Sequence, residues 1–402
     1  SEQRKDQIFV RVRVGDGRLD FTPGQPSPEW ALAPAFALGG TSKLTAEDLN
    51  QALTGKQVSA GLAVTDDAFL LQGATRPADL VVQLQLLAAY LTDPGWRPNG
   101  WERLRSIAPA LQSQLASTPG GVFGRDTGAL LRGGDMRWGT PTLAQMTGSS
   151  IGQGKAALAA PLANDPIELI IVGDIKVDDA IREVAATFGA LPPRSGVRAT
   201  PFPLAFPAAP KDIVTLTHKG REDQGLAFIA WPTLGFHADP KLVRTLNLLA
   251  SVYQLRLTER LREQEGVTYS PAAAHSASDV FERYGYLFGR IEAPPSRLPR
   301  FFEEAQEIAS DLRSKPITDD ELTRARKPLL ERIQRDRAGN EWWLNELAGL
   351  GEDPRVLKSI ESQVPDYHAI TPAELETAAK RFLVPDKAYR LVVVPEKKTV
   401  KR

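Results

Sequence analysis

Prolines crowd one stretch near the middle of this chain and limit what can fold around it. They stand at positions 192, 193, 201, 203, 207 and 210. A proline fixes its own φ angle and lacks an amide donor, so this density excludes both a helix and a central strand. We therefore predict a linker over residues 192–210 that joins two domains, residues 1–191 and 211–402.

The composition excludes several classes of function. The 49 basic residues balance the 49 acidic ones, so no general attraction to nucleic acid or to anionic lipid is expected. The absence of cysteine removes disulfides, thiolate metal sites and cysteine nucleophiles. No apolar run approaches the roughly 18 residues that a membrane-spanning helix needs. We therefore expect neither a nucleic-acid partner nor a membrane span.

Local patterns predict most elements of the first domain. Residues 8–14 alternate apolar and basic side chains, as a half-buried strand does. Apolar residues of 79–91 fall on one helical face, and the glycine-rich segment 120–135 is predicted to be a loop. Further predictions are a hairpin over 58–64 and 68–72, and a helix over 45–53 with Thr45 as its cap.

The second half of the chain repeats the order of elements of the first half. Each half has the same order of elements: a hairpin, a long amphipathic helix, a proline, a second helix and a final strand. Matching residues in the two halves are separated by a nearly constant number of positions. The matches are Pro98 and Leu104 with Pro316 and Leu322, and Leu162 and Asp165 with Leu383 and Asp386. Hairpins followed by helices are typical of α+β proteins. We predict two homologous α+β domains, each a mostly antiparallel sheet with helices packed on one face.

The candidate chemistry lies between Leu255 and Pro271. Its first eleven residues favour a helix, Gly266 can end that helix, and the residues up to Tyr269 favour a strand. This geometry brings Arg262, in the last helical turn, near Tyr269. A guanidinium and a phenol both donate hydrogen bonds, so together they can hold a carbonyl oxygen that gains negative charge during a reaction.

The pattern Leu261-Arg262-x-x-x-Gly266-x-x-Tyr269 resembles the arginine–tyrosine pair of the pitrilysin/insulinase family of zinc metallopeptidases. Two further segments, Gly173-Asp174 and Phe188-Gly189-Ala190-Leu191-Pro192, are similar to the ending of the repeated domain in that family. The resemblance covers essentially the whole chain. Each motif alone is weak, but their order and spacing together are fairly specific.

The chain departs from active members of the family at the zinc site. Those members carry His-x-x-Glu-His on a helix, whose two histidines reach one zinc ion while the glutamate activates water. Aligning that helix by the following Gly40-Thr41 places Ala31, Pro34 and Ala35 at the three motif positions. No histidine precedes His218. We expect no metal site and no cofactor in this chain, and zinc in a partner half.

The resemblance implies a non-catalytic half of a clamshell-shaped peptidase. Its partners would be a zinc-bearing half, fused upstream or separate, and a peptide substrate. Arg262 and Tyr269 would serve catalysis and substrate binding, and His275 is assigned to the same substrate cleft. The first strand of the family's opening hairpin is missing before residue 8, so we expect a fragment of a longer chain. The compartment is not fixed by the sequence, and the bacterial periplasm serves as a working hypothesis.

Alternative interpretations stay open. The competing function is a catalytically dead core or scaffold subunit of the same fold, in which Arg262 pairs with a neighbouring glutamate and Tyr269 packs in a core. A third is a serine hydrolase using Ser150 in Gly-x-Ser-x-Gly, although no buried strand precedes it as such an elbow requires. His218 and Glu222 are predicted to be surface residues.

Overall fold

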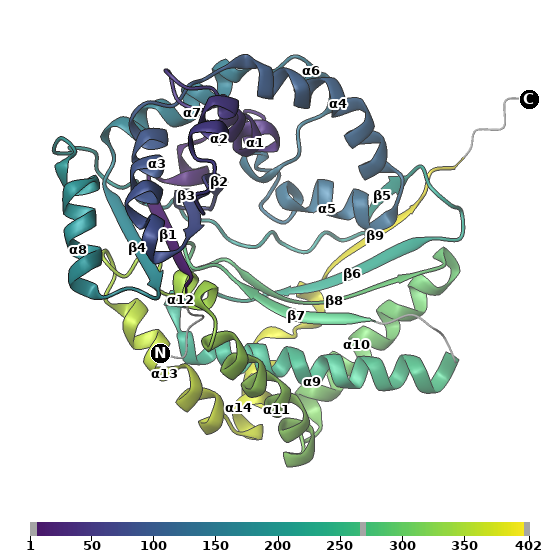
Figure 1. Ribbon diagram of the computed structural model, residues 1–402. Helices are drawn as coiled ribbons and strands as arrows, with labels where there is room; N and C mark the ends of the chain where they lie inside the picture. Colours follow the sequence, from purple (N-terminus) through teal and green to yellow (C-terminus); the bar gives the residue numbers. More distant parts are fainter. Residues whose placement is uncertain (1–5, 266–270, 398–402) are drawn as a thin grey trace, which may run out of the picture. The chain divides into compact units, whose positions relative to one another are not determined.

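The computed structural model describes residues 6–265 and 271–397, and the side chains of residues 262–265 lie outside that description. The chain forms two compact units (Figure 1). Unit 1 comprises residues 1–109, 136–200 and 333–360, and unit 2 comprises residues 110–135, 201–332 and 361–402. Each unit has its own sheet and its own helices.

The sheet of unit 1 has the strand order β2-β3-β1-β4 and is antiparallel throughout. Strand β1 is central because its alternating side chains serve both faces: Ile8, Val10 and Val12 are fully buried in the main core. Phe9 and Arg11 point to the other face. The strands are β1 (Ile8–Val14), β2 (Gly61–Val64), β3 (Phe69–Thr75) and β4 (Ile167–Gly173).

Helices cover both faces of this sheet. The main core lies between the sheet and α1, α3 and α7, while α12 packs on β1 and β4 from the opposite face. Glu168 holds the turn after α12 by accepting hydrogen bonds from the amides of Gly349 (2.8 Å) and Gly351 (2.9 Å). The helices of unit 1 are α1 (Glu29–Gly39), α2 (Ala46–Ala52), α3 (Leu80–Thr92), the start of α4 (Pro98–Ala116), α6 (Leu143–Thr147), α7 (Ile151–Asn164), α8 (Val177–Ala186) and α12 (Asn340–Glu346).

Unit 2 contains a sheet of order β5-β9-β6-β8-β7, in which only β5 and β9 pair in parallel among the described residues. Its strands are β5 (Val214–His218), β6 (Gly225–Pro232), β7 (Ala272–Ala277), β8 (Gly285–Ala293) and β9 (Tyr389–Pro395). Helices α9 and α10 pack on one face (Figure 1). Its helices are α5 (Pro119–Leu130), α9 (Pro240–Glu265), α10 (Leu298–Ser314) and α14 (Pro372–Phe382). Helices α11 (Asp319–Arg337) and α13 (Arg355–Ala369) belong to unit 2 up to residue 332 and from residue 361, respectively.

The predicted contiguous domains 1–191 and 211–402 differ from the observed units. The main division, at residues 200 and 201, does fall inside the proline-rich stretch. However, residues 110–135 join the second sheet and residues 333–360 join the first. Each segment packs against a sheet that is distant in sequence: Phe123 of α5 contacts Phe228 of β6 with ring centroids 5.1 Å apart. Sequence order alone gives no sign of this exchange, because it depends on long-range packing.

The prediction of a loop over 120–135 is wrong, because Pro119–Leu130 forms helix α5. Thr118 caps this helix by accepting a hydrogen bond from the amide of Gly121, and Pro119 occupies the first helical position, where its missing amide costs nothing. Its buried Val122 and its contacts with β5, β6 and β9 show that packing on the second sheet outweighs the low helix propensity of the glycines.

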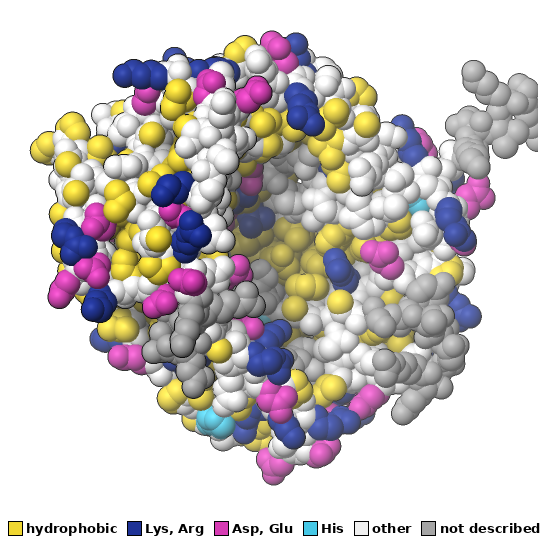
Figure 2. All heavy atoms as spheres, viewed as in Figure 1, with side chains coloured by type: hydrophobic (Ala, Val, Ile, Leu, Met, Phe, Trp, Pro, Cys, Tyr) yellow, Lys and Arg dark blue, Asp and Glu magenta, His cyan; other side chains and the backbone are white. Residues whose placement is uncertain are grey.

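The predicted α+β class is confirmed by the mixture of helices with largely antiparallel sheets, although helices occupy more than one face of each sheet. Basic and acidic side chains are interspersed on the face shown in Figure 2, as the zero net charge leads one to expect. Among the residues that the structure describes, no helix combines the length and apolar character needed to cross a membrane.

Candidate functional site

Helix α9 carries the first predicted site residue. The helix runs without interruption from Pro240 to Glu265 and is anchored by fully buried Leu249, Tyr253 and Leu257. Tyr253 fixes its middle by donating a hydrogen bond to the carbonyl of Ala305 in α10 (3.0 Å). Arg262 lies in the last turn of α9, as predicted, but its side chain lies outside the described residues, as does Tyr269. The proposed pairing of these two side chains therefore stays a prediction.

His275 lies on β7, and its ring faces α9. Its Nδ1 is 2.9 Å from Oδ1 of Asn247, and its Nε2 is 2.8 Å from Oγ1 of Thr233. Asn247 uses its Nδ2 to donate to the hydroxyl of Tyr367 (3.0 Å), so its Oδ1 must accept from Nδ1–H of the histidine. The ring is then the neutral tautomer with hydrogen on Nδ1, and Thr233 donates to Nε2.

Burial lowers the pKa of His275 to about 3. The residue is therefore neutral at physiological pH and has partners at both nitrogens inside unit 2. Its predicted role in substrate binding stays a prediction. The contacts that are described show it fastening β7 to α9.

The position predicted for a zinc-binding helix is filled by packed small side chains. Helix α1 spans Glu29–Gly39, and both Ala31 and Ala35 are 0% exposed in the main core of unit 1. Gly100 of α4 approaches so closely that a Cβ added there would lie 3.1 Å from the Cα of Ala35. Imidazole rings would not fit at these two positions without displacing neighbouring helices. The residues present therefore do not fit a zinc site.

One cluster in unit 1 has carboxylates close enough to bind a cation. The side chains of Asp16, Asp20 and Asp165 offer oxygens within 4.8 Å of one another, and this is the one such group among the described parts of the chain. Burial raises the pKa of Asp20 to about 6, and the charges of Asp16 and Asp165 act in the same direction. Asp20 already accepts from the amide of Asp16 (2.8 Å), and Asp16 accepts from the amide of Ala199 (2.8 Å). Asp16 and Asp165 thus bind segment 194–199 through the amide of Ala199 and the guanidinium of Arg194.

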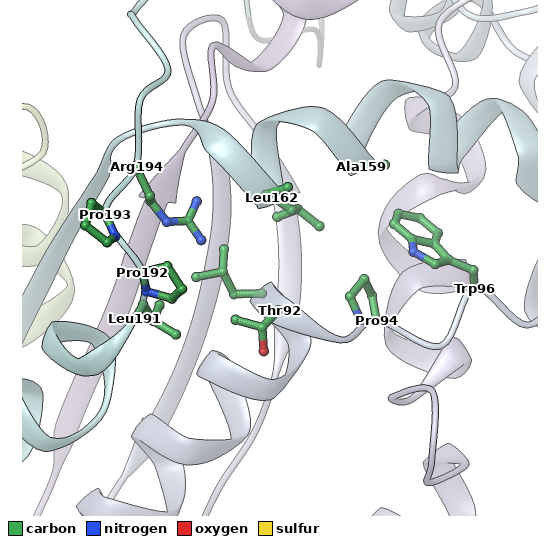
Figure 3. Close-up of a pocket in the computed structure, with 11 residues that line it drawn as sticks. Thr92, Pro94, Trp96, Ala159, Leu162, Leu191, Pro192, Pro193 and Arg194 are labelled. Atoms are coloured by element: carbon green, nitrogen blue, oxygen red, sulfur yellow. The ribbon is translucent and has the colours of Figure 1, made fainter.

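Unit 1 also contains an apolar hollow of about 430 Å³ (Figure 3). The end of α3, the turn at Trp96, the side of α7 and residues 191–194 line it. Among the described residues that line the hollow, Arg194 is the one charged residue. Its guanidinium donates to the carbonyl of Asp165 (3.0 Å), and the nearby Asp165 carboxylate favours its charged form.

The prediction that His218 lies at the surface is wrong. Its side chain is 0% exposed at the end of β5. The amide of Gly220 donates to Nδ1 (3.1 Å), so Nε2 carries the hydrogen and donates to the carbonyl of Gln224 (2.9 Å). The ring closes the turn between β5 and β6. Glu222 is exposed, as predicted.

The comparisons with known proteins agree with this geometry. The family described as Peptidase M16 inactive domain matches residues 162–329. The chain is 21% identical over 433 residues to the chloroplastic stromal processing peptidase of Arabidopsis thaliana, in an alignment covering 93% of this chain and 34% of that protein. The corresponding peptidase of Oryza sativa subsp. indica is 28% identical over 106 residues, covering 26% of this chain and 8% of that protein. The chain thus spans about a third of the Arabidopsis relative.

Solved structures share the fold of the whole chain. A peptidase M16 inactive domain from Pseudomonas fluorescens matches with a TM-score of 0.81 at 17% identity, covering 98% of this chain and 94% of that one. The periplasmic protease PqqL from Escherichia coli matches with a TM-score of 0.78, also at 17% identity, covering 98% of this chain and 43% of that one. The predicted resemblance is confirmed, because residues 162–329 match the peptidase M16 inactive domain. The whole chain shares the fold of a solved structure that is described as such a domain.

Proposed function

We propose that this chain is the substrate-binding, non-catalytic half of a zinc metallopeptidase that cleaves peptides when it closes against a zinc-bearing half. The observation that carries the proposal is the filled core at α1, where buried Ala31 and Ala35 occupy the histidine positions. A half that cannot hold the metal contributes to peptide cleavage only by binding the substrate and by stabilising charge.

Arg262 and Tyr269 supply that contribution in the proposal. During cleavage the oxygen of the scissile carbonyl gains negative charge, and the hydroxyl of Tyr269 donates a hydrogen bond to it. The guanidinium of Arg262 holds neighbouring carbonyls of the peptide and adds positive charge. Zinc, in the partner half, supplies the activation of water. Because the two groups come from the opposite half, they act only in the closed assembly.

The test is steady-state cleavage of internally quenched fluorogenic peptides by the assembled enzyme. Tyr269→Phe is expected to lower kcat by about 10²–10³, as for the loss of one oxyanion donor. Arg262→Ala should raise KM as well, because it also removes ground-state binding. Thermal melts should change little for Tyr269→Phe, since only a hydroxyl is removed.

Matched controls come from elsewhere in the chain. Tyr389→Phe removes a hydroxyl from buried β9, and Arg335→Ala removes a guanidinium from the exposed last turn of α11. Both should leave kcat and KM unchanged. Unchanged rates for Tyr269→Phe and Arg262→Ala, with normal melts, would refute the proposal and favour a scaffold subunit.

A further inference from the structure

The hollow in unit 1 is lined mainly by apolar side chains and carries one charged residue at one end. Figure 3 shows it beside α7, with Arg194 and Leu162 near one end and Trp96 and Ala159 near the other. Its volume of about 430 Å³ lies within the range of sites that bind small molecules. At the roughly 30 Å³ that a water molecule takes in the liquid, it has room for about 14 non-hydrogen atoms.

The wall at Trp96 is held firmly by its neighbours. Trp96 has a φ of +48°, which residues other than glycine rarely adopt and which persists only where the surroundings hold it. Its ring packs on Phe36 with centroids 5.7 Å apart. The guanidinium of the adjacent Arg97 donates to several carbonyls of the chain after α1, among them that of Ser42 (3.1 Å). The indole is therefore fixed as one wall of the hollow.

The wall at the other end, residues 191–194, is fastened to the end of α7. The amide of Gly196 donates to the carbonyl of Asn164 (2.9 Å), and Arg194 donates to the carbonyl of Asp165 (3.0 Å). Both walls are thus held by contacts within unit 1, as is typical of a binding site that is formed before its ligand arrives.

Arg194 brings a guanidinium with two unused nitrogens to its end of the hollow. Its bond to the main chain of Asp165 engages Nη1; within the described residues, Nε and Nη2 have no acceptor and the guanidinium forms no ion pair. The Asp165 carboxylate favours its charged form but also belongs to the cluster with Asp16 and Asp20. Burial lowers the pKa of Arg194, yet a guanidinium stays protonated in proteins. An anion at Nε and Nη2 would therefore complete its hydrogen bonds.

We propose that this hollow binds a medium-chain aliphatic carboxylate, with the carboxylate on Nε and Nη2 of Arg194 and the alkyl chain beside α7 toward Trp96. A guanidinium and a carboxylate pair through two parallel hydrogen bonds. The apolar lining removes the alkyl chain from water. Ala159 and Ala163, about one turn apart on α7, leave room for the chain because each carries only a methyl group.

A peptide suits this lining less well than an alkyl chain does. A peptide main chain brings a donor and an acceptor at nearly every residue, and each needs a partner when buried. Pro94, Pro192 and Pro193 line the hollow and have no amide hydrogen to offer. The hydroxyl of Thr92 already donates to the carbonyl of Ala88 (2.8 Å). An alkyl chain needs no such partners, so the lining favours an acyl chain over the carboxylate end of a peptide.

Isothermal titration of the full chain with sodium octanoate at pH 7.5 tests the site. Binding should saturate at one octanoate per chain with a Kd below about 1 mM. Each further pair of methylene groups, from hexanoate to decanoate, should tighten binding about tenfold. Octan-1-ol and octylammonium carry no anion and should bind at least about tenfold more weakly than octanoate. No saturation, or equal affinity for octylammonium, would overturn the inference.

Arg194→Met tests the carboxylate end, because it keeps an apolar stem of similar length and removes the guanidinium. It should weaken octanoate binding at least about tenfold and leave octan-1-ol within about twofold. Arg103→Met is the matched control: Arg103 is exposed on α4 in unit 1 and is not among the described residues that line the hollow. An unchanged affinity for octanoate in Arg194→Met would refute the assignment of the carboxylate to Arg194.

Ala159→Phe tests the alkyl end without altering Arg194. Ala159 is exposed on α7 and lines the hollow, so a phenyl ring there should occupy the space of the chain and weaken octanoate and octan-1-ol at least about tenfold. Ala160→Phe, at an exposed position of the same helix outside the described lining, should change neither. Equal weakening by the two variants would mean that octanoate adsorbs to apolar surface in general, and the inference would fail.

Acetyl-trileucine with a free carboxylate tests the competing occupant. It should bind at least about tenfold more weakly than octanoate, since its amide groups find few partners in the lining. Tighter binding than octanoate, lost in Arg194→Met, would overturn the acyl chain in favour of a peptide end. None of these titrations depends on peptide cleavage, so their outcome is independent of the proposed function.

Discussion

Helices α1 and α9 differ in the side chains that join them to the rest of their units: those of α1 are apolar, and α9 also uses polar ones. Helix α1 is 11 residues long, and its buried side chains, including Ala31 and Ala35, pack in the main core of unit 1. Helix α9 is 26 residues long and uses Asn247 and Gln254 to bind a neighbouring strand. Helix α1 thus has tight apolar packing at the positions where a metal site would need imidazole rings. Helix α9 instead uses polar side chains to hold β7 in place.

The largest effect is expected from restoring the histidine motif in α1. A variant combining Ala31→His, Pro34→Glu and Ala35→His should lose about 3 kcal/mol or more of stability, because two rings enter a fully packed core. Tight zinc binding should not appear. Urea unfolding and metal analysis after dialysis check both points. Ala33→His, at a partly buried position of α1, should cost much less. A stably folded variant with one zinc per chain would show that α1 retains the geometry of a metal site.

The next effect concerns pH and unit 2. The pKa of His275 is lowered to about 3, so the unfolded chain binds a proton at this residue more readily than the folded one. Its contribution to stability is fully present above the unfolded pKa of about 6.5 and is lost as the pH falls toward 3. As the pH falls from 7.5 to 5, protonation of this group in the unfolded chain should lower the free energy of unfolding of the wild type by about 2 kcal/mol.

The variant His275→Gln tests this, because it does not titrate but keeps a donor and an acceptor. Urea unfolding at pH 7.5 and pH 5, followed by circular dichroism, should show that the variant loses about 2 kcal/mol less than wild type between the two values. Equal losses in both proteins would mean that His275 accepts a proton without disturbing its contacts to Asn247 and Thr233.

The smallest expected effect concerns Asp20 in unit 1, whose contribution to stability falls as the pH rises, the opposite of His275. The pKa of Asp20 is raised to about 6, so the folded chain binds the proton more tightly than the unfolded one. The stability from this group is present below the unfolded pKa of about 3.9 and is lost as the pH rises through 6. The free energy of unfolding of Asp20→Asn, relative to that of wild type, should therefore rise by about 1 kcal/mol between pH 4 and pH 7.5. The difference is small because water screens the partly exposed carboxyl.

Unfolding curves at pH 4 and pH 7.5 measure that difference. Asp93→Asn is a suitable control, because Asp93 lies in unit 1 outside the cluster and its carboxylate accepts a hydrogen bond from the hydroxyl of Ser42 (2.5 Å). A difference that does not grow with pH would indicate that Asp20 remains ionised at acidic pH. Opposite slopes for His275→Gln and Asp20→Asn would show that the two units respond to acid in different ways.

Local sequence was sufficient to predict an element when that element is stabilised by its own residues. The alternation in Ile8–Val14 predicts β1 with the bounds that are observed. Thr45 caps α2 through a reciprocal contact with Asp48, as its side chain predicts. The absence of a His-x-x-Glu-His motif before His218 is a property of the sequence alone, because no histidine precedes that residue. By contrast, glycine content predicts a loop for α5, where contacts with the second sheet decide in favour of a helix.

The amino-acid sequence by itself indicated the proline-rich division, the α+β class and the resemblance to M16 peptidases, since each depends on short patterns that can be recognised without the tertiary structure. Only the tertiary structure decided which sheet α5 and α12 cover, which partners His218 and His275 bind, and that Gln254 accepts a hydrogen bond from the amide of Ala273 in β7. Those outcomes join residues far apart in the chain. Their free energy comes from burial and from hydrogen bonds that exist only after the elements have packed, so no local pattern encodes them.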